Sequence, residues 1–173
     1  MKKLEIRNSI KIILLNQKNQ ILLIGIDDNS IRNKSGKYPG RFWQMIGGKI
    51  EEGEDEIAAA KRELFEETGL IPSDVNFGKI VWYGELILSM NSVETLIKQR
   101  FIMAKTSKTF VTMKNLTLEE KAVAKDLKWF SLDEIKNSCE IIYPVGLYGY
   151  LSNLIQNGVP SELTKIILDR DFE

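Results

Sequence analysis

Two runs of apolar residues stand near the start of the chain and are separated by a polar segment. The runs cover residues 10–15 and 21–26, and the segment between them reads Asn16-Gln17-Lys18-Asn19-Gln20. Apolar runs of this length on either side of a short polar turn predict a β-hairpin. Because the apolar character continues along each run, we expect both strands to be buried on both faces.

A polar loop and a short strand are predicted next. Residues 27–40 are polar and contain Gly36 and Pro39, which indicates an exposed loop. A short strand is expected at residues 41–45. The loop would overhang whatever follows that strand.

A helix is predicted from Glu54 to Thr68. The segment holds Ala58-Ala59-Ala60 and many Glu, Lys and Leu residues, and a glycine directly after it favours its end there. An apolar stripe repeats at three- and four-residue steps through Ile57, Ala60 and Leu64. We expect this stripe to dock the helix against a sheet.

Strands and short helices follow the long helix. Residues 80–88 and 95–104 are predicted to be long strands, paired antiparallel through a polar turn. Two short helices are expected where a hydroxyl residue precedes a glutamate at capping-box spacing, and a strand at 126–130 is expected between them. These pairs are Thr117 with Glu120 and Ser131 with Glu134.

The tail from Pro144 to Asp169 is predicted to be helical. Four apolar residues lie at helical spacing, namely Leu147, Leu151, Leu154 and Ile155. The helical pattern is expected to restart after Gly158-Val159-Pro160.

Composition narrows the class of protein. A length of 173 residues fits one domain over residues 1–173, and 43% hydrophobic with 28% charged residues is typical of a water-soluble globular protein. Basic and acidic residues number 24 each, so no positive field attracts nucleic acid, which is not an expected partner. No stretch approaches membrane-spanning length, so neither secretion nor membrane insertion is expected.

The chain has no histidine, which excludes Ser-His-Asp catalysis, Cys-His catalysis and an imidazole-bound zinc site. Cys139 is the only cysteine, so no intramolecular disulfide forms. A reducing, cytoplasmic setting fits this cysteine usage best. Any chemistry must therefore rest on carboxylates, Lys, Arg, Tyr or a bound hard cation.

Three glutamates share one face of the predicted helix. Glu63, Glu66 and Glu67 lie at i, i+3 and i+4, within an arc of about 100°. Like charges at this spacing cost roughly 0.2 to 0.5 kcal/mol per pair unless a positive charge compensates them. Oxygen-only ligands favour Mg²⁺, Mn²⁺ or Ca²⁺, so we expect a divalent cation and a phosphate ester or anhydride as substrate.

Glycines immediately upstream are expected to complete the site. Gly47-Gly48 would let the backbone approach both metal and phosphate closely. Arg62 precedes Glu66 by four residues and is placed to steady a carboxylate, although a plain ion pair along a helix has the same spacing. The sequence therefore predicts that loop and helix form one site.

Residues 48–70 resemble the catalytic motif of the Nudix family. Gly48, Glu54 and the run Arg62-Glu63-Leu64-Phe65-Glu66-Glu67-Thr68-Gly69-Leu70 stand at the spacings of the Nudix box. Softer resemblance extends to Trp43-Gln44, to the strand at 99–104 and to residues 129–135. The chain departs at Ile46, where many members of the family carry proline.

The resemblance implies an α/β fold, an α/β/α sandwich with a mixed β-sheet and the catalytic loop and helix on one side. It also implies that Mg²⁺, with Mn²⁺ as a substitute, is held by the carbonyl of Gly47 and by Glu63, Glu66 and Glu67. Water would then attack a phosphorus of a diphosphate linkage. In the family, Arg62 and Glu54 at these positions support the geometry of the ligands.

The general base differs among members of the family. Glu63 is favoured here, and it stands with Glu67 among the expected catalytic residues. Glu119 or Glu120 is the distant alternative, and a first-turn acid of this kind also fits a simple helix cap.

Several other residues are interpreted as structural. Trp43, Trp82 and Tyr83 are expected in the core rather than stacked on a nucleobase. Cys139 is interpreted as an inert packing residue. For Tyr143-Pro144 and the helix after them there are two interpretations, a border of the pocket or simple packing, and packing is the default.

The resemblance predicts a pyrophosphohydrolase acting on a small nucleoside diphosphate derivative, such as a (deoxy)nucleoside triphosphate, a nucleotide sugar or a dinucleoside polyphosphate. The alternative is a non-catalytic Nudix-like nucleotide-binding or regulatory module, a class that typically loses the box glutamates kept here. The isomerase branch acting on isoprenoid diphosphates relies on a metal-binding histidine, which this chain lacks. A homodimer is compatible with these features.

Overall fold

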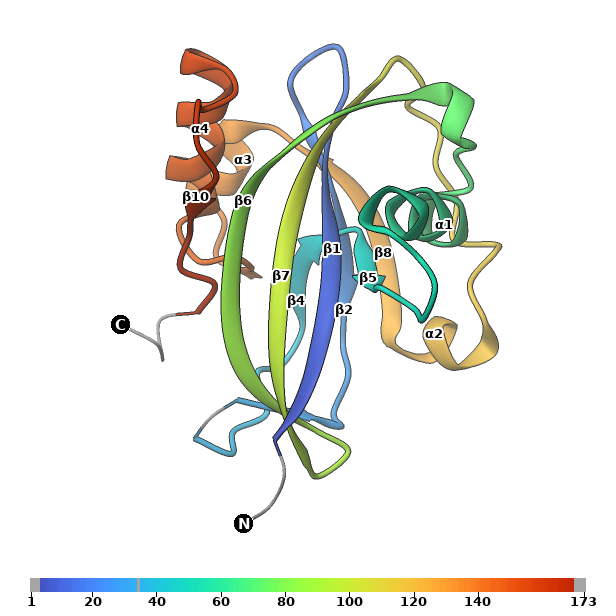
Figure 1. Cartoon of the computed structure of the whole chain (residues 1–173), viewed down its shortest axis with the longest axis vertical. Coiled ribbons are helices and arrows are strands. Elements are labelled where there is room, and N and C mark those ends of the chain that lie inside the picture. The colour runs from blue at the N-terminus through green and yellow to red at the C-terminus, as the bar shows by residue number, and fades with distance from the viewer. Residues whose placement is uncertain (1–3, 34, 170–173) are drawn as a thin grey trace.

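The fold is built on one mixed β-sheet. The computed structural model describes residues 4–33 and 35–169. Within them ten strands share the sheet, with β10-β6-β7-β1-β2-β4-β9 in that order and β3, β5 and β8 paired to β6, β1 and β2 (Figure 1). The strands are β1 (Glu5–Leu15), β2 (Ile21–Ile26), β3 (Ile31–Arg32), β4 (Phe42–Met45), β5 (Gly47–Lys49), β6 (Val75–Met90), β7 (Val93–Thr106), β8 (Ala124–Phe130), β9 (Ile141–Ile142) and β10 (Thr164–Lys165).

Strand β1 lies at the centre of the sheet. It runs parallel to β7 along its whole length, from Glu5 opposite Thr95 to Leu15 opposite Lys105. It also pairs antiparallel with β2 and with the short β5. Burial on both faces from Ser9 to Leu15 follows from this central place and confirms the expectation from its apolar run.

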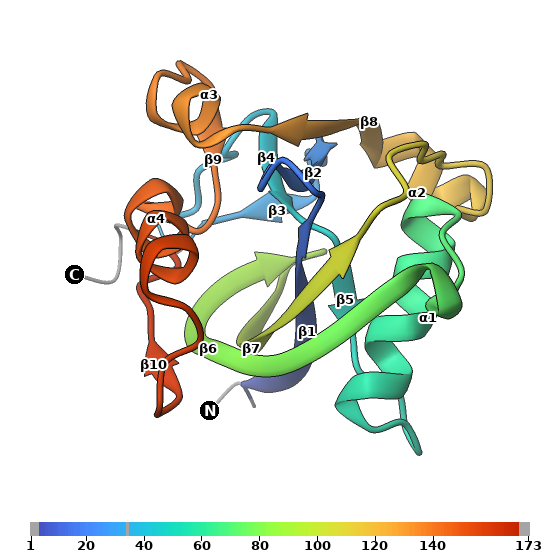
Figure 2. The ribbon, with the colours of Figure 1, turned by 90° about the horizontal axis from the view of Figure 1, so that it is seen from above.

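Helices cover both faces of the sheet. The helices are α1 (Glu56–Thr68), the short 3-10 helix η1 (Pro72–Asp74), α2 (Leu118–Val123), α3 (Leu132–Lys136) and α4 (Leu147–Asn157). Seen from above, α1 lies on one side of the central strands and α4 on the other (Figure 2). The structure therefore confirms the expected α/β/α sandwich with a mixed sheet.

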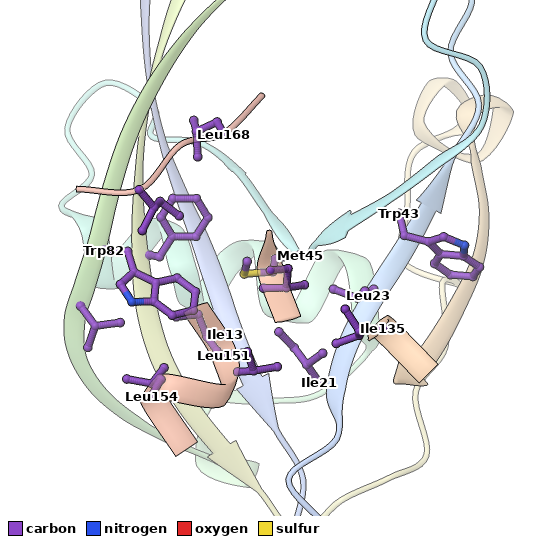
Figure 3. Packing of buried hydrophobic residues seen from close by; sticks show 14 of the residues in the cluster. Ile13, Ile21, Leu23, Trp43, Met45, Trp82, Ile135, Leu151, Leu154 and Leu168 are labelled. Carbon is purple, nitrogen blue, oxygen red and sulfur yellow. The ribbon is translucent and has the colours of Figure 1, made fainter. Parts of the chain in front are cut away.

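Two apolar clusters fill the spaces between these layers. One lies between the sheet and helices α3 and α4, where Trp82, Leu151, Ile135 and Met45 gather (Figure 3). The other lies between the sheet and α1, where Ala59, Ala60 and Leu64 pack on Ile12 and Leu14. Both faces of β1 are therefore buried in the core. The packing of α1 in the second cluster fixes the distance between this helix and the strands.

The predicted strands are present, most of them longer than predicted, and so are the predicted helices up to α4. The hairpin of β1 and β2 forms, and β6 and β7 pair antiparallel. Thr117 and Ser131 cap α2 and α3 with complete capping boxes, as their spacing predicted. The predicted loop at 27–40 also contains β3, two residues that pair with the end of β6.

The apolar stripe of α1 differs from the prediction by one residue. Ile57 is 36% exposed, whereas Ala59 and Ala60 are fully buried beside Leu64. The helix begins at Glu56 after an Asp55 cap, so Ile57 belongs to its first turn. The stripe that contacts the sheet therefore begins one helical turn later.

Two further predictions were wrong. No helix restarts between Pro160 and Asp169, where the described part of the chain ends, because Thr164–Lys165 pairs parallel with β6 and Ile166 and Leu168 alternate inward at the two-residue period of an extended chain. Cys139 is exposed rather than packed, because it lies in the turn between α3 and β9.

No helix in the described part of the chain is both long enough and apolar enough to cross a membrane.

The seating of α1 can be tested by shortening one buried side chain. Leu64→Ala is expected to lower the free energy of unfolding by about 2 to 5 kcal/mol, because Leu64 is fully buried and alanine leaves a cavity. Phe65→Ala is the matched control, since Phe65 is 45% exposed on the same helix. Denaturant unfolding of both variants measures the difference, and equal losses would contradict the proposed docking face.

Candidate active site

Helix α1 is held at both ends by caps. The Asp55 side chain accepts a hydrogen bond from the Ala58 N–H (2.7 Å), and Gly69 ends the helix in the left-handed conformation. The buried stripe fixes the rotation of the helix about its axis. Its acidic face is thereby directed to the glycine turn of β5.

The glycine turn lies directly beside this acidic face. In β5, Gly47 and Gly48 pair with Lys11 and Ile10 of β1. Gly47 has φ +124°, and a Cβ there would collide with the main chain at Ile10, so only glycine fits. The N–H of Gly47 donates a hydrogen bond to Glu67 Oε2 (2.6 Å), which joins turn and helix.

Arg62 is the centre of a network of charges on the same face. Its Nε and Nη2 donate to the two carboxylate oxygens of Glu54 (both 2.9 Å), and Nη2 also donates to the carbonyl of Lys49. Its Nη1 reaches Glu63 (2.9 Å) and Glu66 (3.1 Å). These carboxylates raise the pKa of Arg62, chiefly through Glu54, and Arg62 in turn lowers the pKa of Glu54.

In two of the glutamates, Glu63 and Glu67, burial destabilises the charged form of the carboxyl group. Desolvation raises the pKa of Glu63, which is 9% exposed, although Arg62 opposes the shift. Desolvation also raises the pKa of Glu67, while the charge of Lys11 and the Gly47 N–H counteract it and the charges of Glu63 and Glu120 add to it. Positive charge brought to this face would therefore be stabilising.

The structure brings the predicted site residues together. Glu54, Arg62, Glu63 and Glu66 form the ion-pair network, and Glu67 contacts Gly47. Within residues 4–33 and 35–169, however, no three acidic side chains converge as a group that could hold a metal. Arg62 forms ion pairs with both Glu63 and Glu66. It thereby supplies the positive charge that offsets the repulsion between these two carboxylates.

The two distant candidates for the general base lie on α2. Glu120 Oε2 accepts a hydrogen bond from the Thr117 N–H (2.8 Å), which is the capping role that its position allowed. Its charge nevertheless contributes to the pKa of Glu67. Glu120, of the two, is therefore the one whose charge acts on the acidic face.

A cavity of about 160 Å³ opens beside the glycine turn. Its polar lining includes Arg7, Ser9 and Lys11, at alternate positions of β1, together with Gln44 and Gln99. Its apolar lining includes Leu86, Leu88, Phe101 and Tyr143. Gly48 also lines it, so the cavity and the acidic face meet at the glycines; we call it the β1 cavity.

Aromatic residues divide between core and cavity. Trp43 and Trp82 are each 3% exposed and pack on Phe130 and Phe101, so their interpretation as core residues is confirmed. Tyr143 and Pro144 line the β1 cavity instead of serving only as packing elements.

Sequence reasoning missed Arg7 and Lys11. Lys11 stands within the apolar run at 10–15, and it is only 6% exposed. Its ammonium donates to the carbonyls of Gly47 (3.0 Å) and Met45 (3.4 Å). The sequence signal that marks Lys11 is a single cation inside an otherwise apolar run that is buried on both faces of the sheet.

Comparison with known proteins finds relatives by sequence and by fold. The 8-oxo-dGTP diphosphatase of Buchnera aphidicola is 42% identical over 48 residues, which cover 28% of this chain and 39% of that protein. The RNA pyrophosphohydrolase of Pelagibacter ubique is 37% identical over 67 residues, 39% of this chain and 37% of that protein. The aligned parts thus span less than two fifths of the length of these curated relatives.

The fold matches solved structures over almost the whole chain. The MutT protein of Methanosarcina mazei superposes with a TM-score of 0.57 at 19% identity, covering 91% of this chain and 98% of that one. The sequence profile of the NUDIX domain matches residues 5–144, which include strands β1 to β9, α1 and the glycine turn. With the motif, the layers and this profile in agreement, the chain belongs to the Nudix family.

Proposed function

We propose that this chain is a Mg²⁺-dependent pyrophosphohydrolase that cleaves a diphosphate linkage in a nucleoside diphosphate derivative. The (deoxy)nucleoside triphosphates, nucleotide sugars and dinucleoside polyphosphates are the candidate substrates. The observation that carries the proposal is the hydrogen bond from Gly47 to Glu67, because it joins the acidic face of α1 to the glycine turn, whose Gly48 lines the β1 cavity. The names of the Buchnera and Pelagibacter relatives support a diphosphate linkage as the target.

We assign the carbonyl of Gly47 and the carboxylates of Glu63, Glu66 and Glu67 as ligands of Mg²⁺, with Mn²⁺ as a substitute. All four supply the hard oxygen atoms that these cations prefer. The close approach of Glu63 to Gly48 supports the assignment, since a Cβ there would lie 2.5 Å from Glu63 Oε1 and would push that carboxylate away from the glycine turn. When bound, the cation would polarise a phosphate oxygen and lower the pKa of a bound water.

Arg62 would keep the site in shape while its carboxylates turn toward a cation. Its Nε and Nη2 are held by Glu54 and by the Lys49 carbonyl, and only Nη1 contacts Glu63 and Glu66. The guanidinium can therefore stay in place when these two contacts are given up. Glu54 then serves to position Arg62 rather than to touch the substrate.

Glu63 is proposed as the general base that accepts the proton of the attacking water. Burial raises its pKa, which makes its carboxylate a better proton acceptor than an exposed glutamate. Glu120 is the alternative, because its charge also reaches the acidic face. The single domain, the cytoplasmic location and the homodimer stay predictions.

Removal of one proposed ligand tests the activity. Glu67→Gln is expected to lower Mg²⁺-dependent turnover by at least about 100-fold, because an amide carries no charge for the cation. Release of phosphate or pyrophosphate from a nucleotide panel measures it, with the exposed Glu94→Gln on β7 as the matched control. Unchanged turnover in Glu67→Gln would refute the ligand assignment, and nucleotide binding without turnover in the wild type would favour the regulatory module.

The close approach of Gly48 and Glu63 can be tested by adding one methyl group. Gly48→Ala is expected to push the Glu63 carboxylate aside, since that flexible side chain is what the new Cβ meets. Turnover should fall at least about 10-fold while the melting temperature changes little. Gly149→Ala on α4 is the control, because its Cβ would meet nothing within 4 Å.

The general base can be identified by comparing two glutamates. Glu63→Gln is expected to lower kcat by about 100-fold or more, the range of general-base catalysis, whereas Glu120→Gln should retain most of kcat. Single-turnover measurements at saturating Mg²⁺ separate the chemical step from cation binding. A larger loss in Glu120→Gln would transfer the role to α2.

A further inference from the structure

Arg7 and Lys11 differ from Arg62 in the groups that contact their positive charges. Arg62 contacts the carboxylates of Glu54, Glu63 and Glu66. In the described part of the chain, by contrast, neither Arg7 nor Lys11 forms an ion pair, although both line the β1 cavity. These two cations therefore have no carboxylate at ion-pair distance among the described residues, although the charges of Glu67 and Glu63 act on Lys11 from farther away.

The hydrogen bonds of these two cations are also incomplete. Lys11 is 6% exposed, and its ammonium, which has three donors, contacts the neutral carbonyls of Gly47 and Met45. Arg7 is half-buried, its Nη1 contacts Met90 Sδ at 4.0 Å, and its buried Nε has no hydrogen-bond partner among the described residues. Buried cations of this kind are normally paired, because desolvation without a partner costs several kcal/mol.

The position of Arg7 and Lys11 in the β1 cavity indicates which kind of ligand would supply their missing hydrogen-bond acceptors. They project from one face of β1 and line the same cavity as Gly48, and the charge of Glu63 acts on both. Arg7 and Lys11 thus share one cavity with the glycine turn and with the apolar lining at Leu86 and Phe101. An anion held here would sit next to the proposed site of cleavage.

We propose that Arg7 and Lys11 bind the phosphate groups of the substrate, with Lys11 at the end nearest Gly47 and Arg7 farther along β1. This inference rests on the proposed function and names the residues through which this chain holds a diphosphate. The remaining part of the cavity would take an uncharged group. Its apolar lining at Leu86, Leu88 and Phe101 favours a group without charge at that end.

Lys11 also couples the phosphate to the glycine turn. Its contact with the Gly47 carbonyl means that a phosphate drawing the ammonium into the cavity would free that oxygen. The same carbonyl is a proposed ligand of Mg²⁺. Binding of the diphosphate and exposure of the carbonyl would therefore occur together.

Pyrophosphate is the probe for this proposal, because it presents the phosphate groups alone. Calorimetry in the presence of Mg²⁺ is expected to show binding by the wild type and a loss of about 10- to 100-fold in Arg7→Met and in Lys11→Met, the value of a hydrogen bond to a charged group. Arg7→Lys and Lys11→Arg should recover part of the loss. The exposed Arg41→Met and Lys79→Met, outside the cavity lining, should bind as the wild type does.

Stability separates anion binding from a structural role. Methionine removes a buried charge while keeping the length of the side chain, so the melting temperatures of Arg7→Met and Lys11→Met should stay equal to that of the wild type or rise. Wild-type affinity for pyrophosphate in either methionine variant, or no binding by the wild type, would overturn the proposal. A wild type that binds pyrophosphate through these residues but hydrolyses no nucleotide would refute only the proposed function.

Discussion

The hydrogen bond between the Gly47 N–H and the Glu67 carboxylate is the contact on which the site depends. It joins β5, which is anchored on the central strand β1, to a helix that the core holds at a fixed height and rotation. Without a side chain at Gly47, strand β5 can approach β1 closely enough for this contact. The separation of loop and helix is thus set by backbone packing, whereas the charged side chains adjust within it.

The acidic face shows how the chain tolerates a concentration of negative charge. Arg62 alone contacts three carboxylates, and the Lys11 ammonium and the Gly47 N–H both favour the charged form of Glu67. Each partner is supplied by a different element: α1 itself, strand β1 and the glycine turn. Neutralisation by several modest donors leaves individual contacts weak enough to be exchanged for a bound ligand.

The sequence was sufficient for the features that depend on local spacing. The i, i+3, i+4 glutamates, the glycine pair, the capping boxes at Thr117 and Ser131 and the main strands all follow from neighbours along the chain. Features that depend on partners far away in the sequence were missed. The strand at Thr164–Lys165 exists because β6 offers it an edge, and Ile57 is exposed because the docking of α1 starts one turn later. The β1 cavity required β1, β4, β6 and β7 to be placed together before Arg7 and Lys11 acquired any meaning.

The pairing of β1 with β7 determines when the centre of the sheet can assemble during synthesis. Glu5 lies opposite Thr95, so β1 waits for about 90 further residues to be synthesised before its parallel neighbour exists. At bacterial or eukaryotic elongation rates this wait lasts roughly 5 to 20 s. During it β1 can pair with β2 at Leu15 and with β5 at residues 9–11, while the edge that β7 later occupies stays open to other chains. The central position of β1 in the finished sheet therefore leaves one of its edges unpaired in the nascent chain.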